Sequence, residues 1–446
     1  MENNRVNEFI ENPKKALFKL TLPILVTMFV QVGYNITDTI FVGRLGAEAI
    51  AAITFAFPIF ILMISLNAGI GIGMGSKISR ELGRNNIKSA RSTATHGVIL
   101  SIFIAFLVFI SGTIFIEDII NLLGADEDVK PLAIQYLAIL LFAPFFMFPA
   151  GIFNQIFNGQ GDTKTPMKII VFALIVNIIL DPIFIYTLEL GVAGAAYATL
   201  SAFGCALITF LYFFIKKSEV QFITKGFKFK IHIIKEILSV GIPATLTMIT
   251  MSIYLFFINR FMAHFGTDYV ATFGIVARLE SIAIMPINSI SIAIITLTGM
   301  FYGAKRLDLL DKITWYALRT ATLLSILVGI VFFAIPGILF MIFTNENHII
   351  ELGITYMRIN VFTFPFMAIT AVISRTMQGM GYGFPGMIVN FTRVLFIAVP
   401  LSFVFIYFFG FPYTTVPIAG VIGGAIGSIV GIILYKILLK KCKTNC

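Results

Sequence analysis

The sequence is poor in charge and in cysteine. Only 12% of its 446 residues are charged, 58% are hydrophobic, and the mean hydropathy is +0.96. A chain with so few charges and so many apolar residues is not a water-soluble globular protein. The three cysteines, Cys205, Cys442 and Cys446, form neither a disulfide framework nor a metal-ligand pattern.

Apolar runs of about 20 residues or more recur along the whole chain, as in polytopic helical membrane proteins. They do not alternate at a period of two residues, so they are not strands of a membrane barrel. The N-terminal segment, residues 1–15, is polar and charged, which predicts a first span that serves as its own insertion signal rather than a cleaved signal peptide. The sequence predicts twelve transmembrane helices, at roughly 16–42, 48–76, 92–116, 131–157, 165–188, 191–215, 236–262, 270–302, 313–342, 349–376, 385–409 and 417–440.

The net charge of +10 follows the predicted membrane topology. Basic residues gather in alternate loops, at 77–91 and 216–235, whereas the loop at 117–128 is acidic. Cytoplasmic loops of membrane proteins carry such an excess of Lys and Arg. We therefore expect a multi-pass protein of the inner or plasma membrane with both termini in the cytoplasm, and no nucleic-acid partner.

The two halves of the chain repeat each other at one constant offset, the one that pairs Pro23 with Pro243. Parallel repeats of this kind place a transport path at the interface between the halves. The sequence thus predicts an all-α polytopic membrane protein with two six-helix lobes, residues 1–215 and 236–446, joined by a cytoplasmic linker at 216–235. The other matching pairs are Thr27 and Thr247, Met28 and Met248, Tyr34 and Tyr254, Gly46 and Gly266, and the turns 159–161 and 379–381.

Two aspartates interrupt the apolar spans of the first half. Asp38 and Asp181 each lie inside a predicted transmembrane helix, where a charged side chain costs about 2.5–3.5 kcal/mol by insertion scales. The second copy has Ile258 and Pro400 at or next to the matching positions. A constraint of the fold would affect both copies, so the asymmetry favours a function in ion or substrate handling.

Further polar residues share helix faces with these aspartates, because residues three, four and seven apart lie on one side of a helix. Such faces must meet the protein interior or water. Hydrogen bonding between helices is the alternative explanation for any single amide. The groups are Gln31, Tyr34, Asn35 and Asp38 on the first span, Asn154 and Asn158 on the fourth, and Asn177 and Asp181 on the fifth.

The chemistry of these side chains suits a coupling ion, H⁺ or Na⁺. Burial disfavours a charged carboxylate, so a proton can bind and leave there, and two nearby acids would titrate together. Asp38, Asp181, Asn177 and Thr199 also supply oxygen atoms that could hold Na⁺. We favour H⁺ over Na⁺, because two ionised acids in one dry pocket repel each other.

The sequence resembles the multidrug and toxic compound extrusion (MATE) family, in particular its DinF-like prokaryotic branch. The resemblance rests on Gln31-x-x-Tyr34-Asn35-x-x-Asp38, on the segment 155–163 and on Asn177-x-x-x-Asp181-Pro182. It implies twelve helices and a cation site in the first lobe. Another branch has an acidic site in the second lobe, but the seventh and tenth spans here contain no interior acid. The implied cation site is Asp38, Asn177, Asp181 and Thr199, with Gln31, Tyr34, Tyr136, Asn154 and Asn158 around it.

The eighth span carries Arg278 and Glu280, two residues apart. Side chains at this spacing do not face each other on a helix, so each needs a partner on another helix. A structural ion pair is one interpretation. The other makes Glu280 a candidate for drug binding or proton relay.

These observations predict a cation-coupled multidrug efflux antiporter that exports hydrophobic, often cationic compounds by alternating access. It would be a monomer and not an enzyme, with no cofactor beyond the coupling ion. A flippase for lipid-linked oligosaccharides, or a polysaccharide exporter, would need basic cavity residues, whereas the first lobe offers acids and amides. An intramembrane aspartyl protease is suggested by the Gly-x-Gly-Asp pattern at 159–162, but this segment is a predicted cytoplasmic turn without a Pro-Ala-Leu partner motif.

Overall fold

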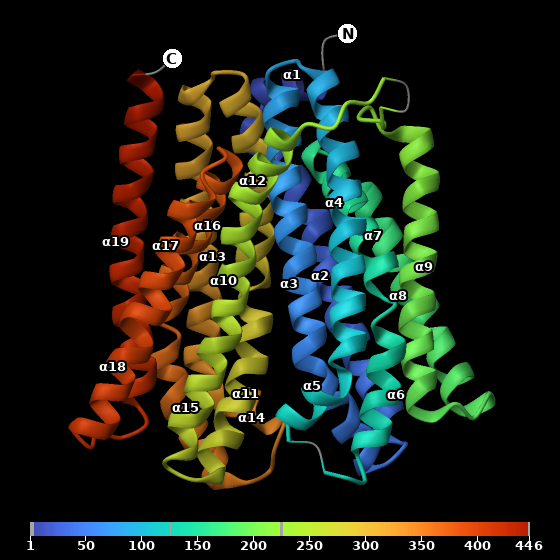
Figure 1. Ribbon diagram of the computed structural model, residues 1–446. Helices are drawn as coiled ribbons and strands as arrows, with labels where there is room; N and C mark the ends of the chain where they lie inside the picture. The colour runs from blue at the N-terminus through green and yellow to red at the C-terminus, as the bar shows by residue number, and fades with distance from the viewer. Residues whose placement is uncertain (1–3, 125, 224–225, 445–446) are drawn as a thin grey trace. The chain divides into compact units, whose positions relative to one another are not determined.

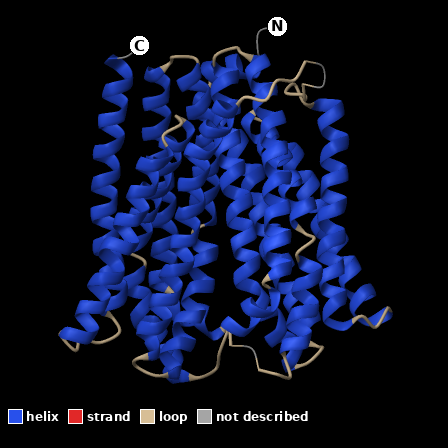
Figure 2. Cartoon of the chain, in the orientation of Figure 1, coloured by secondary structure: helices blue, strands red, loops and turns tan. Residues whose placement is uncertain are grey.

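The computed structural model describes residues 4–124, 126–223 and 226–444, and every regular element in these ranges is a helix (Figure 1). The side chains of residues 4, 35, 36, 38, 39 and 47 lie outside the description. Figure 2 shows that most connections between helices are short loops and turns, whereas a longer segment joins α9 to α10. The predicted all-α fold is confirmed for the described part of the chain.

The chain divides into two compact units, which we call the N unit and the C unit. The N unit is Leu22–Gly241, and the C unit is Met1–Thr21 with Ile242–Cys446. These units differ from the predicted lobes at their ends. The segment Met1–Thr21 belongs to the C unit, and the predicted linker, 216–235, belongs to the N unit.

The N unit contains the elements of the first half of the chain. Its helices are the larger part of α2 (Pro13–Gly43), α3 (Ala47–Gly83), α4 (Ile87–Ile114), α5 (Ile116–Leu122), α6 (Lys130–Leu140), α7 (Pro144–Gly159), α8 (Lys164–Pro182), the π-helix η1 (Ile183–Thr187), α9 (Gly191–Lys217) and the start of α10 (Ile231–Ala263).

The C unit contains the remaining elements. They are α1 (Asn4–Glu11), the start of α2, the larger part of α10, α11 (Thr267–Ala283), α12 (Met285–Gly303), α13 (Leu307–Ala334), α14 (Pro336–Met341), α15 (Asn347–Asn360), α16 (Thr363–Gly379), α17 (Gly383–Phe391), the π-helix η2 (Thr392–Ala398), α18 (Val399–Phe403), the π-helix η3 (Val404–Phe408) and α19 (Thr415–Thr444).

The number of membrane spans agrees with the sequence. Within the described residues, ten helices are long and apolar enough to cross a bilayer, and two bent helix pairs bring the number to as many as twelve. The bends lie between α6 and α7, at 47°, and between α15 and α16, at 49°. The sequence predicted each of these pairs as one uninterrupted span. The two bends lie at equivalent positions in the two halves of the chain, so the bend is part of the repeat.

The two halves of the repeat also share the backbone conformation of several turns. Positive φ angles occur at pairs of residues related by the offset of the repeat, so the two halves turn in the same way at the same places. At Gly46 and Gly266 a φ of 109° and 132° precedes α3 and α11, a conformation that glycine adopts without the steric cost of a Cβ atom. The other pairs are Asn85 with Lys305 and Gly161 with Gly381.

The first turns of α10 are fixed to α3 within the N unit. The ammonium of Lys77, which is 3% exposed, lies 2.6 Å from the carboxylate of Glu236. Beside this ion pair the two helices approach so closely that a Cβ atom at Gly73 would overlap the carbonyl oxygen of Ile237. Glycine is therefore required at position 73 for α10 to start where it does.

The segment between α9 and α10 is held to α4 by a buried histidine. His96, fully buried, accepts a hydrogen bond at Nε2 from the backbone N–H of Lys230, at 2.8 Å, and its Nδ1 lies 2.7 Å from the carbonyl oxygen of Ser92. The rings of Phe227 and Phe229 pack against the imidazole. This segment is therefore an integral part of the N unit rather than a free connection.

We expect His96→Leu to loosen this segment. Leucine removes the acceptor of the Lys230 N–H, and the loss of one such hydrogen bond costs about 0.5–1.5 kcal/mol. Trypsin should then cleave after Lys228 and Lys230 faster than in the unsubstituted protein. His232→Leu, at an exposed site on α10, is the control. Equal cleavage rates in the two variants would contradict a role of His96 in holding the segment.

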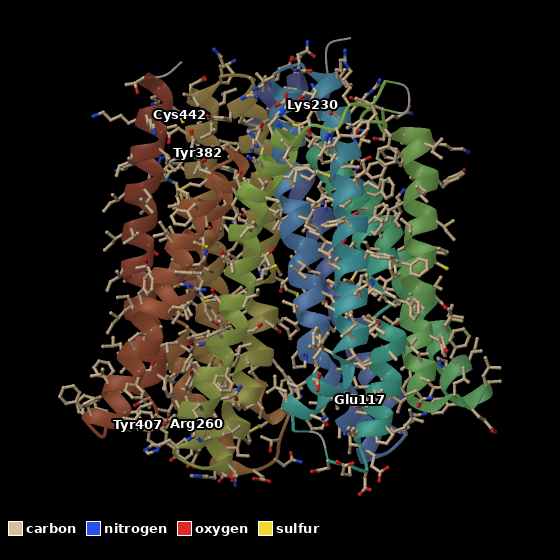
Figure 3. The ribbon with its side chains drawn as sticks, viewed as in Figure 1. Glu117, Lys230, Arg260, Tyr382, Tyr407 and Cys442 are labelled. Carbon is tan, nitrogen blue, oxygen red and sulfur yellow. The ribbon has the colours of Figure 1, made fainter. Side chains whose placement is uncertain are left out.

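Residues of the acidic and the basic loop lie at different ends of the N unit. Glu117 and Lys230 lie at opposite ends of this unit (Figure 3). Glu117 belongs to the acidic loop that we predicted outside, and Lys230 to the basic segment that we predicted inside. In the C unit, Arg260 lies at the end opposite Cys442 (Figure 3).

Candidate functional site

The buried polar centre of the N unit lies on α8. Asp181 is fully buried and Asn177 is 1% exposed. They are four residues apart in one helix and therefore share a face, as the sequence predicted. The amide nitrogen and oxygen of Asn177 form no hydrogen bond with any described residue. A buried amide in this state is rare in folded proteins.

α8 ends at Pro182, directly after Asp181, because proline cannot continue the pattern of α-helical hydrogen bonds. The chain continues as the π-helix η1. Short π-helical segments in α-helices often occur at functional sites. The C unit has a matching π-helix, η3, at nearly the repeat-related position, so the geometry is common to both halves, whereas the aspartate occurs only in the first.

Three helices of the N unit meet one turn away from the aspartate. Val42 of α2, Ile185 of η1 and Ala195 of α9 form a buried apolar cluster. The hydroxyl of Tyr186 also donates a hydrogen bond to the backbone oxygen of Phe41, at 2.5 Å. The end of α2 is thus attached to η1.

The positions of the predicted cation-site residues along their helices can be compared through this cluster. Position 38 is four residues before Val42, Asp181 is four residues before Ile185, and Thr199 is four residues after Ala195. Four residues make about one helical turn. α2 and α8 run in the same direction and α9 runs against them, so all three positions lie one turn from the cluster on the same side.

The other predicted residues of the N unit have different environments. Thr199 is 9% exposed, on α9, and α8 packs against α9. Tyr136 of α6 packs against the apolar cluster of Val42, Ile185 and Ala195. The amide of Asn158 donates to the side-chain oxygen of Asn154, at 3.0 Å, so this bond lies within α7 and does not join two helices.

The polar face of α2 is only partly described. Gln31 is exposed and Tyr34 is half-buried. The side chains of Asn35 and Asp38 lie outside the described residues. Their backbone belongs to α2.

The C unit contains a cavity of about 190 Å³, which we call the C-unit cavity. Glu280 of α11 lines it, so this candidate belongs to a different site from the others. Arg278, two residues earlier, is exposed and does not line the cavity. The polar lining is completed by Arg393 of η2, Asn360 at the end of α15, Tyr254 of α10, Ser281 of α11 and Thr363 of α16.

Arg393 and Asn360 were not predicted from the sequence. Arg393 interrupts the apolar run 385–409, which is the same signal that identified the two aspartates. Asn360 has a weaker signal, because single amides in membrane helices are common structural features. Its place at the bend between α15 and α16 could not be read from hydropathy.

Two repeat-related bundles of membrane-crossing helices, with a buried carboxylate in one and a polar cavity in the other, define a polytopic membrane transporter. A model of the MatE family matches residues 23–183 and 243–404, the two halves of the repeat. The chain belongs to this family, the multidrug and toxic compound extrusion transporters.

Known relatives agree over nearly the full length. The chain is 26% identical to the probable multidrug resistance protein YoeA of Bacillus subtilis, over 91% of this chain and 89% of that protein. It is 28% identical to the probable multidrug resistance protein NorM of Thermotoga maritima, over 92% and 89%. An outward-facing structure of a multidrug resistance MATE family transporter of the MOP superfamily matches with a TM-score of 0.92 and 31% identity, covering 97% of both chains.

Proposed function

We propose that this MATE family protein exports hydrophobic, often cationic compounds in exchange for H⁺ or Na⁺. Its family makes it a multidrug efflux transporter rather than an enzyme. The first-half motifs support a place in the DinF-like branch. We further propose a monomer in the inner or plasma membrane, with both termini cytoplasmic, because the basic loops lie on one predicted side.

The buried pair Asn177 and Asp181 is the observation that carries the coupling proposal. An ionised carboxylate is costly in a dry protein interior. In this proposal Asp181 binds the coupling proton or contacts the coupling cation. The amide of Asn177 has no hydrogen-bond partner among the described residues, so its oxygen is free to contact such an ion. Thr199, and Asp38 one turn from Val42, complete the proposed site.

Drug and ion would compete through this site. If the ion lowers the affinity for a cationic drug, the drug lowers the affinity for the ion by the same factor, since linkage is reciprocal. Gln31 and Tyr34 on the same helix as Asp38 would then contact the drug or the water of its pathway. Asn35, Tyr136, Asn154 and Asn158 belong to the same proposed surroundings.

Alternating access requires helices that can bend between two lobes. We propose that the N unit and the C unit are these lobes, with ends that differ from the predicted 1–215 and 236–446. The division between the units falls within α2 just before Pro23, and within α10 just before Pro243. Proline removes a helical hydrogen bond and permits a kink. In both helices a threonine four residues later, Thr27 or Thr247, donates to the proline carbonyl oxygen, a contact that often accompanies helix bending.

The choice of ion can be tested by the uptake of ethidium, added outside, into everted membrane vesicles. We expect a proton gradient at zero Na⁺ to drive transport, and collapse of that gradient to stop it. Two acids that share one dry site hold at least one proton more readily than they hold none. Transport that persists without a proton gradient and requires Na⁺ would assign the site to Na⁺. Transport that neither gradient drives would contradict the antiport mechanism.

A further inference from the structure

The C-unit cavity combines an apolar wall with opposite charges. Met251, Leu255, Phe273 and Met367 supply most of the apolar lining, and Arg393 and Glu280 face the same space. The two charged groups interact electrostatically, and Asn360 lies beside Glu280. A guanidinium inside a membrane protein is costly, so its presence calls for a function or a partner.

The hydrogen-bond donors of this cavity are incompletely used. Nη2 of Arg393 donates to the sulfur of Met251, at 3.5 Å, which is a weak acceptor. Neither Nε of Arg393 nor Nδ2 of Asn360 has the distance and angle of a hydrogen bond to any described residue. Asn360 is only 6% exposed. Both unused atoms are donors, so the group that would satisfy them is an acceptor.

The charged residues of the cavity are absent from the other half of the repeat. Arg393 corresponds to Ala173, and Glu280 corresponds to Phe60. Tyr254, by contrast, corresponds to Tyr34, so the tyrosine belongs to the shared fold. The charges are therefore no requirement of the six-helix architecture. The same reasoning identified the aspartates of the first half.

We propose that the C-unit cavity binds the carboxylate or sulfonate group of an otherwise apolar compound, so that the transporter also accepts organic anions. This inference rests on the proposed export function for its physiological meaning, but the binding itself can be measured alone. Arg393 and Asn360 donate hydrogen bonds to the anion, the methionines and Phe273 contact its apolar body, and Glu280 opposes its charge. Hydrogen bonds between charged groups are stronger than those between neutral groups, above all in a low-dielectric site.

The size of the cavity limits what it holds. Pockets that bury a whole drug-sized ligand have volumes of about 300–1,000 Å³. The C-unit cavity, at about 190 Å³, accommodates the acidic group and the adjoining part of a larger molecule. The methionine side chains that line it adapt to apolar groups of different shape.

A matched pair of probes tests the sign of the recognised charge. Dansylglycine carries a carboxylate and dansyl-ethylenediamine carries an ammonium on the same fluorescent body. Binding of each is measured by dansyl fluorescence to the full-length protein in nanodiscs of neutral lipid. We expect dansylglycine to bind, Arg393→Met to weaken it about tenfold or more, and Glu280→Gln to strengthen it several-fold.

Two further variants separate recognition from folding. Asn360→Leu keeps the volume and removes the amide together with its interaction with Glu280. We expect little change in the melting temperature and a loss of dansylglycine affinity of about two- to tenfold. Arg278→Met removes an exposed guanidinium from α11 and should leave the affinity unchanged. If Asn360→Leu changes the binding of neither probe, and Arg393→Met lowers the melting temperature without changing binding, the charges are a structural pair and the proposal is overturned.

The remaining outcomes are also decisive. If Glu280→Gln weakens dansyl-ethylenediamine while Arg393→Met strengthens it, the cavity recognises cations and the proposal is overturned. Asp181→Asn, in the other unit, should retain dansylglycine binding. Failure of ethidium export in the unsubstituted protein, together with normal dansylglycine binding, would refute the proposed antiport and leave the anion site in place.

Discussion

Asp181→Asn should abolish ion-driven drug export while leaving the protein folded. Asparagine has the same shape but neither releases a proton nor balances the charge of Na⁺. An ion that couples to a drug typically changes its affinity about 5- to 150-fold, and this ratio should fall to about one in the variant. Everted vesicles would show no drug accumulation against a gradient, and drug binding would no longer respond to pH or Na⁺.

The control for this variant is Asp128→Asn, in the acidic loop between α5 and α6, where the side chain is exposed. It should transport at the normal rate. Because Asp181 is fully buried, its neutral replacement should also keep or raise the melting temperature. Normal coupled export by Asp181→Asn would contradict the assignment of the coupling site to α8.

Gly73→Ala should strongly destabilise the N unit. The added methyl group would overlap the backbone oxygen of Ile237, which cannot move without shifting the start of α10. Overpacking of this type costs about 1–3 kcal/mol and occasionally more, and a clash with backbone belongs to the upper end. For a unit of this size, about 3 kcal/mol corresponds to a drop in melting temperature of roughly 6–12 °C.

Gly274→Ala provides the comparison. Gly274 lies within α11, and a Cβ atom there would meet no atom within 4 Å. Alanine is the better helix former, so this variant should be as stable as the unsubstituted protein or more so. Equal melting temperatures for the Gly73 and Gly274 variants would show that α10 can shift away from α3 at little cost.

The spans and the repeat were predictable because hydropathy and the constant offset between the two halves are properties of long segments. The bends after Leu140 and Asn360 were not, since the residues there remain apolar and a hydropathy window passes over them. The sequence placed Asn177 and Asp181 on one face, and both are buried. The sequence predicted that the polar face of Gln31 meets protein or water, but it did not show which of the two, and Gln31 is exposed.

Glu280 and Arg393, the charged pair of the C-unit cavity, show a second limit of prediction from sequence. Glu280 was noticed with Arg278, its neighbour in sequence, whereas the structure places it with Arg393, which is distant in the chain. Interactions between distant helices depend on which faces meet, and periodicity alone does not determine that. The same rule that selected Asp38 and Asp181 would have selected Arg393 if it had been applied to bases as well as acids.

Each unit contains a short segment from the other half of the chain, and this has a consequence for biosynthesis. The segment Met1–Thr21 is translated before the rest of its unit, which begins at Ile242. Conversely, the N unit lacks the first turns of α10 until the second half of the chain is being made. Neither unit is therefore finished when the first six spans have entered the bilayer. A nascent chain that stops between α9 and α10 would therefore leave both units incomplete.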